Sequence, residues 1–247
     1  MDKGCERMTG SVQIAGLQKM TLLDFPGKVA CTVFTQGCNF RCPFCHNSDL
    51  IGGNGPDSIS EETLLAFLKK RVGLLDGVCF TGGEPTLQKE LPRLFRQIKD
   101  LGYPIKLDTN GSRPEVLKAL VAEGLVDYVA MDIKNSPARY EQTAGMNPKL
   151  MAAVEESAAF LLTGAVDYEL RTTVMDELHD EEAFREMGNW LQSLQPDHKI
   201  RRFFLQPYTD RESVLVGGFT APCNEKLEKL AKIMAPFAES VSIRAMD

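Results

Sequence analysis

Short apolar runs alternate with longer amphipathic segments along most of this chain. The runs are rich in β-branched and aromatic residues, and several are nearly continuous, which is typical of parallel strands buried on both faces. The predicted strands are Val29–Thr35, Val78–Thr81, Ile105–Asp108, Tyr128–Ile133, Tyr168–Val174, Arg202–Gln206 and Val241–Arg244.

The segments between these runs have apolar residues at helical spacing. Ser60 can cap the first predicted helix, in which Leu64 and Leu68 share one face. Pro114 suits the first turn of another helix. The predicted helices are Glu61–Arg71, Leu91–Leu101, Pro114–Glu123, Lys149–Leu162, Glu181–Leu194 and Ala221–Ala238.

Six strand–helix units and a short final strand predict an α/β fold with a parallel sheet and right-handed crossovers. A closed eight-fold barrel takes about 250 residues, and this chain has 247. Because residues 1–28 and 36–59 stand outside the repeat, we expect an incomplete, TIM-like (β/α)6 barrel. We interpret residues 1–247 as one domain, with 1–28 as an N-terminal extension or hairpin and 29–247 as the partial barrel.

Composition narrows the class of protein. The hydrophobic fraction of 43% is ordinary for a globular chain, and no apolar run predicts a membrane span. The net charge of −6 argues against a general nucleic-acid binder. The seven cysteines, without an apolar export signal near residue 1, indicate reduced thiols and a cytoplasmic location. Cys5 and Cys223 are isolated, and neither receives a role.

Three cysteines lie close together directly after the first predicted strand. Cys38, Cys42 and Cys45 have the spacing C-x3-C-x2-C, in a loop that also contains Gly, Pro and Asn. Three thiolates suit a [4Fe-4S] cluster that keeps one iron free of protein ligands. A small molecule can bind such an open iron and receive an electron from the cluster.

Three other interpretations of these cysteines fit the sequence less well than the [4Fe-4S] cluster. The string from Cys42 to His46 matches the c-type haem attachment pattern, but that chemistry belongs to exported proteins and leaves Cys38 unexplained. A Cys3His zinc site would need the adjacent Cys45 and His46 to reach one ion. Inert core thiols are difficult to bury in a loop of this kind.

Polar residues follow the carboxyl ends of six successive predicted strands, which is where strand–helix barrels carry their function. They are the cysteine loop, Thr81–Pro85, Asp108–Gly111, Met131–Lys134, the pair Glu169 and Arg171, and Gln206–Thr209. Packing alone does not explain such a set. Glycines expose backbone to a ligand, and two acids with a lysine suit a ligand that bears an ammonium, a carboxylate and a ribose.

These segments resemble the radical S-adenosylmethionine (SAM) activating enzymes of glycyl radical enzymes, most closely the anaerobic ribonucleoside-triphosphate reductase activating proteins. The similar segments are Gly16–Lys28, residues 37–47, Thr81–Gln88, Lys106–Gly111 and Val126–Lys134. The resemblance covers nearly the whole chain and is strongest over residues 16–175. It implies a partial barrel of the radical SAM type, one [4Fe-4S] cluster, and SAM.

The resemblance also implies roles for individual residues. The cluster ligands would be Cys38, Cys42 and Cys45. The side chain that lines the adenine site would be Phe44. The residues that meet the SAM amino group would be Gly82, Gly83, Glu84 and Pro85. The residues around the SAM carboxylate, together with a monovalent cation, would be Asp108, Thr109, Asp132 and Lys134.

The implied reaction is reductive cleavage of SAM and abstraction of a hydrogen atom from a glycine of a protein partner. A flavodoxin- or ferredoxin-like protein would donate the electron. Arg171, a candidate catalytic residue, could be a structural ion pair, or it could contact the partner's glycine loop together with Tyr208. Thr209 stands where pyruvate formate-lyase activases carry His, which argues against that partner.

Two alternatives remain open at this point. One is a small-molecule radical SAM enzyme, such as a 7-carboxy-7-deazaguanine synthase-like protein. The other is an Fe-S sensor that binds SAM without turning it over.

Overall fold

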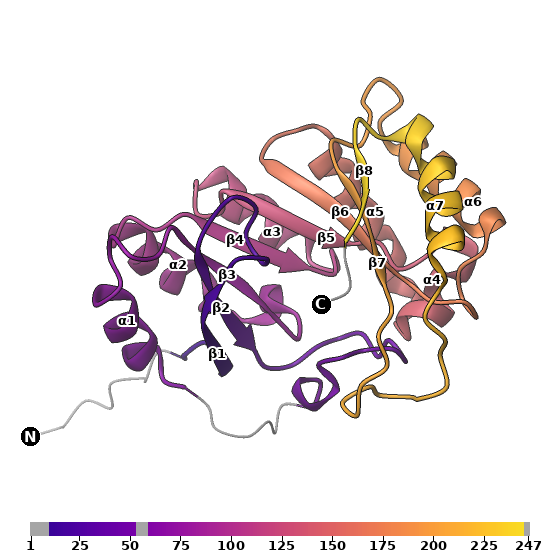
Figure 1. Ribbon diagram of the computed structural model, residues 1–247. Helices are drawn as coiled ribbons and strands as arrows, with labels where there is room; N and C mark the ends of the chain where they lie inside the picture. The colour runs from indigo at the N-terminus through magenta and orange to yellow at the C-terminus, as the bar shows by residue number, and fades with distance from the viewer. Residues whose placement is uncertain (1–9, 53–58, 245–247) are drawn as a thin grey trace, which may run out of the picture.

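The computed structural model describes residues 10–52 and 59–244 (Figure 1). Within these ranges one eight-stranded sheet follows chain order, with β1 antiparallel to β2 and all later neighbours parallel. The strands are β1 (Ile14–Thr21), β2 (Ala30–Thr35), β3 (Gly77–Gly82), β4 (Ile105–Thr109), β5 (Tyr128–Asp132), β6 (Asp167–Val174), β7 (Phe203–Pro207) and β8 (Val241–Ile243). The helices are α1 (Glu61–Lys69), α2 (Leu91–Asp100), α3 (Pro114–Ala122), α4 (Pro137–Ala144), α5 (Met151–Leu162), α6 (Glu181–Leu194) and α7 (Asn224–Met234).

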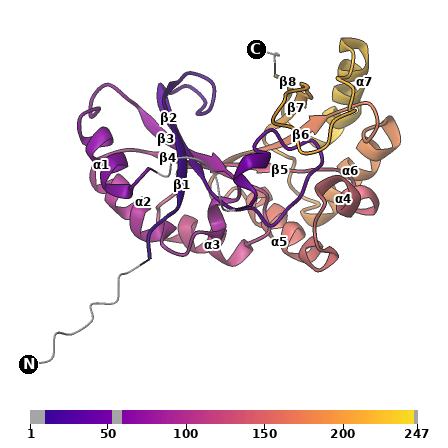
Figure 2. The same cartoon turned by 90° about the horizontal axis from the view of Figure 1, so that it is seen from below.

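The sheet curls, and its helices cover only the outer face (Figure 2). Alternation along each strand explains the two faces. In β4, Ile105 and Leu107 belong to the apolar core, while Lys106 and Asp108 belong to the charged cluster described below. Because the inner face is enclosed by the curl, even these charged side chains are buried. The apolar core therefore lies between sheet and helices, and the polar chemistry lies inside the curl.

The expected incomplete barrel is confirmed. The sheet ends at β1 on one side and at β8 on the other, and these two strands do not pair with each other. The six strand–helix units and the short final strand account for β2 to β8. Of the segment predicted as an N-terminal extension or hairpin (residues 1–28), the described part contains one strand, β1, which pairs antiparallel with the first barrel strand, β2. This arrangement leaves one lateral side of the barrel open.

Several predicted boundaries and one element were wrong. The sequence pattern did not predict α4, an eight-residue helix from Pro137 to Ala144 that is terminated by Gly145 with φ of +54°. The predicted helix Lys149–Leu162 begins instead at Met151, after a 3-10 turn opened by Pro148. The helix predicted over Ala221–Ala238 is shortened to α7, and Pro236 lies in the 3-10 turn that follows it.

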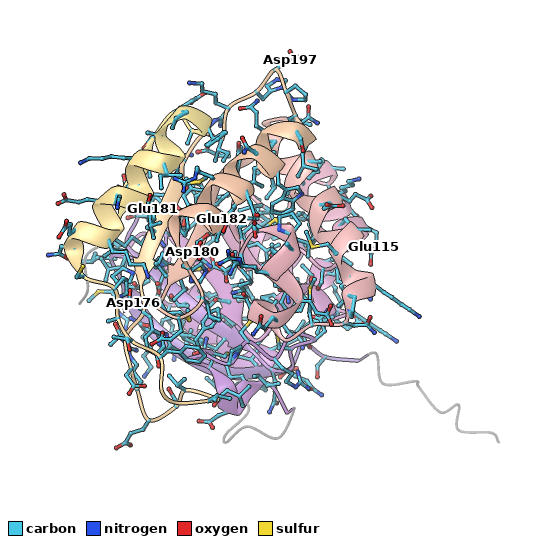
Figure 3. The ribbon with its side chains drawn as sticks, turned by 90° about the vertical axis from the view of Figure 1, so that its right-hand side faces the viewer. Glu115, Asp176, Asp180, Glu181, Glu182 and Asp197 are labelled. Atoms are coloured by element: carbon cyan, nitrogen blue, oxygen red, sulfur yellow. The ribbon has the colours of Figure 1, made fainter. Side chains whose placement is uncertain are left out.

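Capping explains where α6 begins. The Asp180 carboxylate accepts a hydrogen bond of 2.8 Å from Ala183 N, which satisfies one free amide of the first turn. Glu181 and Glu182 follow in that turn, where the helix dipole favours negative charge. Figure 3 shows the three carboxylates gathered at this end of the helix. None of the helices described here is long and apolar enough to cross a membrane.

We predict that Gly188→Ala destabilises the fold at the α6 packing interface. A Cβ at this position would lie 2.4 Å from the Phe237 ring. Overpacking of this kind costs about 1–3 kcal/mol. Urea denaturation should show the loss, whereas the matched change Gly217→Ala, where a Cβ meets nothing within 4 Å, should leave the free energy of unfolding unchanged. Equal stabilities would contradict the packing argument.

Candidate active site

The cysteine loop follows β2 and lines one cavity of about 460 Å³. Cys38, Cys42 and Cys45 all contribute to its wall, and the cavity reaches from them along the inner face of the sheet. Cys45 N donates to Cys42 O at 3.0 Å, so the second and third cysteines share one tight turn. The structure therefore brings together the three residues that the spacing singled out.

Contacts with the end of α4 hold this loop in place. Arg41 N donates to the carbonyl oxygens of Ala144 and Gly145, each at 3.1 Å. A Cβ on Gly145 would lie 2.3 Å from the Arg41 oxygen, so only glycine allows this approach. The Cys42 thiol also donates to Ala144 O, at 3.4 Å. The helix missed by the sequence pattern thus shapes the cysteine loop.

The chemistry of these thiols fits a multi-iron cluster. Burial raises the pKa of Cys38 to about 12 and also raises the pKa of Cys42 and Cys45, so bound iron would be needed to keep the thiolates charged. Within the described residues, no three His, Cys, Asp or Glu side chains are gathered for a single metal ion. A [4Fe-4S] cluster would take each of the three thiolates on a different iron, so these side chains need not converge on one ion.

His46 is already held by other groups. Its Nε2 is 2.6 Å from Thr209 O, and its ring stacks on Tyr208 with centroids 5.7 Å apart. A carbonyl partner requires Nε2 to carry the proton, which leaves this nitrogen unable to bind a metal. Because Nδ1 keeps its lone pair, this bond alone does not rule out a metal; the argument against a Cys3His zinc site is that, within the described residues, no three His, Cys, Asp or Glu side chains gather for one ion.

The loop after β3 packs directly against the cysteine loop. Gly82 has φ of +108°, and a Cβ on Gly83 would lie 2.1 Å from Gly37 O. Hydrogen bonds from Gly83 N to Thr35 O (2.9 Å) and from Glu84 N to Gly37 O (2.8 Å) join the two loops. The two glycines are therefore required for the backbones to approach, besides exposing backbone to the cavity.

Glu84 is buried and fully hydrogen-bonded. Its carboxylate accepts from Thr86 N at 3.1 Å, Thr109 Oγ1 at 2.8 Å and Asn110 N at 2.6 Å. Burial raises the pKa of this carboxyl, although these donors oppose the change. Glu84 thereby joins the loop after β3 to the loop after β4. Pro85 is buried in the turn that follows and does not line the cavity.

Five charged side chains form a row across β4, β5 and β6. Arg171 Nη1 lies 3.0 Å from Asp108 Oδ2, and Arg171 Nε lies 2.9 Å from Asp132 Oδ1. Lys106 pairs with Asp108 at one end, and Lys134 Nζ lies 2.9 Å from Asp132 Oδ2 at the other. Arg171 is the central cation of this row, so its guanidinium is held by two carboxylates rather than presented to solvent.

The row has one more positive than negative charge. Burial raises the pKa of Asp132, but the charges of Arg171 and Lys134 outweigh it and hold that pKa well below its usual range. Burial lowers the pKa of Lys134, and Asp132 more than reverses the effect. All five groups therefore stay ionised near neutral pH. Four of them, Asp108, Asp132, Lys134 and Arg171, line the cavity with balanced charges, whereas Lys106 does not line it.

Lys134 also lies beside the aromatic residue of the cysteine loop. Its Nζ is 5.9 Å from the centre of the Phe44 ring, a distance typical of cation–π contact. Phe44 packs edge-on against Phe219 at 6.4 Å. The residues expected at the adenine and carboxylate ends of SAM thus line the same cavity.

Two residues differ from what their sequence context suggested. Tyr208 is fully buried and donates to Asp210 at 2.8 Å, so the expectation that it faces a partner was wrong. His179, which lies directly before the capping residue of α6, is buried, accepts from Met175 N at 3.3 Å, and donates through Nε2 to Lys134 O at 2.9 Å. His179 therefore holds the backbone of Lys134, and no sequence motif marked this contact.

Comparison with known proteins places this site in a family. A model of the radical SAM superfamily matches residues 32–187, more than half of the chain. The chain belongs to the radical SAM superfamily. It is a radical SAM enzyme, and membership implies a [4Fe-4S] cluster and SAM as its cofactors.

Individual relatives agree with this assignment. One relative is a Methanocaldococcus jannaschii protein that is provisionally named a glycyl-radical enzyme activating enzyme. The two sequences are 28% identical, and the match covers 95% of this chain and 96% of the relative. It is 29% identical over 82% of its length to the pyruvate formate-lyase-activating enzyme of Streptococcus mutans, covering 79% of it. The crystal structure of Streptococcus suis SuiB bound to SAM superposes with a TM-score of 0.64 and 14% identity, over 85% of this chain and 48% of SuiB. This last likeness shows the fold alone.

We predict that Arg171→Met costs both stability and SAM affinity. The change leaves Asp108 and Asp132 buried without their shared cation, which typically costs about 3–5 kcal/mol. Urea denaturation and SAM titration calorimetry measure the two effects. Arg96→Met, which breaks an exposed pair with Glu123, is the control and should cost at most about 1 kcal/mol. Wild-type stability and SAM affinity in Arg171→Met would contradict the role of the row.

We predict that His179 makes the fold sensitive to acid. Burial lowers its pKa from 6.5 to about 4, so the folded state disfavours protonation. This stabilising contribution is complete above pH 6.5 and is lost as the pH falls toward 4. The loss should reach about 3 kcal/mol at pH 4. In urea denaturation across this range, His179→Gln should lose less stability than the wild type, and parallel curves would contradict the assignment.

Proposed function

We propose that this enzyme activates a glycyl radical enzyme, and that its partner is an anaerobic ribonucleoside-triphosphate reductase. The observation that carries the proposal is one cavity that begins at the three cysteines, passes the charged row, and reaches Gln18 and Asp24 at the β1–β2 hairpin. It therefore extends to the free β1 edge of the sheet. The similarity to activating enzymes over nearly the full chain supports a protein as the substrate.

The residues of the cavity have distinct proposed tasks. When bound, the cluster and SAM supply the one-electron cleavage of SAM and the abstraction of a hydrogen atom from glycine. Cys38, Cys42 and Cys45 would hold the cluster. The backbone of Gly82 and Gly83 would accept hydrogen bonds from the SAM amino group.

The charged row would orient SAM. The Lys134 ammonium, at the end of the row nearest Phe44, suits the SAM carboxylate. Glu84 and Thr109 would fix the loops around the amino group, since they hydrogen-bond each other across them. Asp108 and Asp132 already have cationic partners, and a monovalent cation beside them stays a prediction.

The enclosing sheet has a further task. The hydrogen abstraction that the cofactors would supply has to be confined to the intended glycine, so other hydrogen donors must be kept out of the cavity. The curl of the sheet encloses the cavity on the strand side, and β1 and β8 are the two edges of the sheet. In the proposed reaction, a polypeptide segment would enter between these edges. A glycine suits the substrate position because it has no side chain to collide with the wall.

We predict that anaerobically reconstituted enzyme generates a glycyl radical on its partner. With flavodoxin or dithionite as reductant, it should form methionine, 5′-deoxyadenosine and a protein-based EPR doublet on anaerobic ribonucleoside-triphosphate reductase. Cys42→Ser should abolish iron binding and all three products. Cys223→Ser is the matched control, because Cys223 is exposed and does not line the cavity. Cys5→Ser is a second control variant, at a position outside the described residues.

Other outcomes identify other functions. Formation of 5′-deoxyadenosine only with a small molecule, and no glycyl radical on any partner, would favour the 7-carboxy-7-deazaguanine synthase-like alternative. Binding of SAM with no 5′-deoxyadenosine under any reductant would favour the sensor. Iron retained at wild-type level in Cys42→Ser would overturn the cluster assignment itself.

A further inference from the structure

The turn between β1 and β2 exposes three large apolar side chains. Met20, Leu22 and Leu23, here called the hairpin tip, are 63%, 68% and 64% exposed. A single exposed leucine is ordinary, but adjacent exposed apolar residues on a soluble protein mark an interaction surface. The hairpin tip is therefore a candidate docking surface.

The hairpin tip is held in place rather than left unsupported. Thr21 Oγ1 accepts hydrogen bonds from Leu23 N at 3.2 Å and Asp24 N at 3.3 Å. The next residue, Phe25, is buried and packs against Tyr128 with ring centroids 6.1 Å apart. The fold thus anchors both ends of a short turn while keeping its leucines in water. A partner that covers them loses little conformational freedom of the tip.

The opposite face of the same turn belongs to the active-site cavity. Asp24 accepts a hydrogen bond from the Thr32 hydroxyl inside the curl, and both residues line the cavity together with Gln18. Two successive residues, Leu23 and Asp24, therefore face solvent and cavity respectively. Leu23 of the hairpin tip and Asp24 of the cavity wall are adjacent in sequence, at the amino end of β2, whereas the cysteine loop follows the carboxyl end of the same strand.

The size of the cavity requires contacts outside it. A volume of about 460 Å³ is that of a small-molecule site, so only a short segment of a protein can enter beside SAM. The rest of a protein substrate must lie against the surface around the opening. Figures 1 and 2 both show the β1–β2 turn and β8 on either side of the open side of the sheet.

Charge around the hairpin tip indicates the chemistry of the partner. Lys19 and Lys28 flank the three apolar residues in sequence. Lys28 lies over the Phe25 ring at 5.5 Å, and within the described residues neither lysine pairs with a carboxylate. The exposed Asp76 carboxylate lies beside Lys28, where it accepts from Val29 N at 3.0 Å. Among the described residues, Lys19 is therefore the cation next to the tip with no acid paired to it, on a chain whose net charge is −6. An apolar segment with acidic neighbours would complement the tip and Lys19.

We propose that the hairpin tip docks the protein substrate, through an apolar, acid-flanked segment next to the glycine loop that enters the cavity. This inference rests on the proposed function and names the surface on which its partner is recognised. The tip takes no part in cluster or SAM binding. Its removal therefore weakens the partner complex and leaves the chemistry of the isolated enzyme intact.

The test compares two double variants in which two exposed apolar residues become serine. Leu22→Ser/Leu23→Ser alters the hairpin tip, and Val72→Ser/Leu74→Ser alters residues of similar exposure, 57% and 65%, between α1 and β3. The partner used is anaerobic ribonucleoside-triphosphate reductase of the source organism. Two quantities are measured: the partner concentration that gives half-maximal glycyl radical, and the 5′-deoxyadenosine formed without partner.

The hairpin variant should need about tenfold more partner, because two central apolar contacts of an interface are lost. Its iron content and uncoupled SAM cleavage should stay within about twofold of wild type, as should every measurement on the control variant. In the same assay, Lys19→Gln should weaken binding less and reduce its dependence on salt.

Each contrary outcome overturns a defined statement. An unchanged partner requirement in the hairpin variant, or an equal change in the control, overturns the docking surface alone. Loss of uncoupled SAM cleavage in the hairpin variant also overturns the docking surface, because the hairpin tip would then be needed for the active site itself. A dimer that sedimentation shows to dissociate in the hairpin variant assigns the tip to a second copy of this chain. No glycyl radical with the wild-type enzyme overturns the proposed function, and this inference with it.

Discussion

The row of buried charges inside the curl is the constraint on which the rest of the structure depends. Asp108, Asp132 and Arg171 come from β4, β5 and β6, and each carboxylate needs the guanidinium between them. Charges buried in a protein are tolerated only when they are paired and hydrogen-bonded. The pairing therefore holds three strands at one spacing, and it places Arg171 and its two carboxylate partners on the cavity wall.

The loops that line the cavity also hold one another in position. The cysteine loop touches the end of α4 through Gly145 and touches the loop after β3 through Gly83. Glu84 then joins that loop to the one after β4. Loops fixed by backbone contact and by a buried carboxylate have few alternative conformations, which suits a site that must hold a reactive ligand in one position.

The open side of the sheet leaves a path by which a large substrate can reach the cavity. A closed barrel would surround the cavity, whereas here β1 turns back antiparallel on β2 and leaves a free edge. That turn presents polar residues inward and leucines outward within one short segment. The same hairpin can therefore border the cavity and meet a large substrate, which a barrel closed by an eighth parallel strand could not do.

The sequence by itself determined the local features: the strands and most helices, the C-x3-C-x2-C spacing, and the polar residues at the strand ends. These follow from periodicity and from residue chemistry, which act over a few neighbouring positions. It could not reveal α4, because eight residues with little apolar periodicity resemble a loop until they pack against the cysteine loop.

Only the tertiary structure decided how distant residues combine. It paired Arg171 with two acids instead of presenting it to a partner, buried Tyr208, and brought His179 to the Lys134 carbonyl. Such contacts join residues 39 or more positions apart, and no local pattern records them. Their physical reason is burial: once the sheet curls, every polar group inside it must find its partner among whatever the other strands and loops bring near.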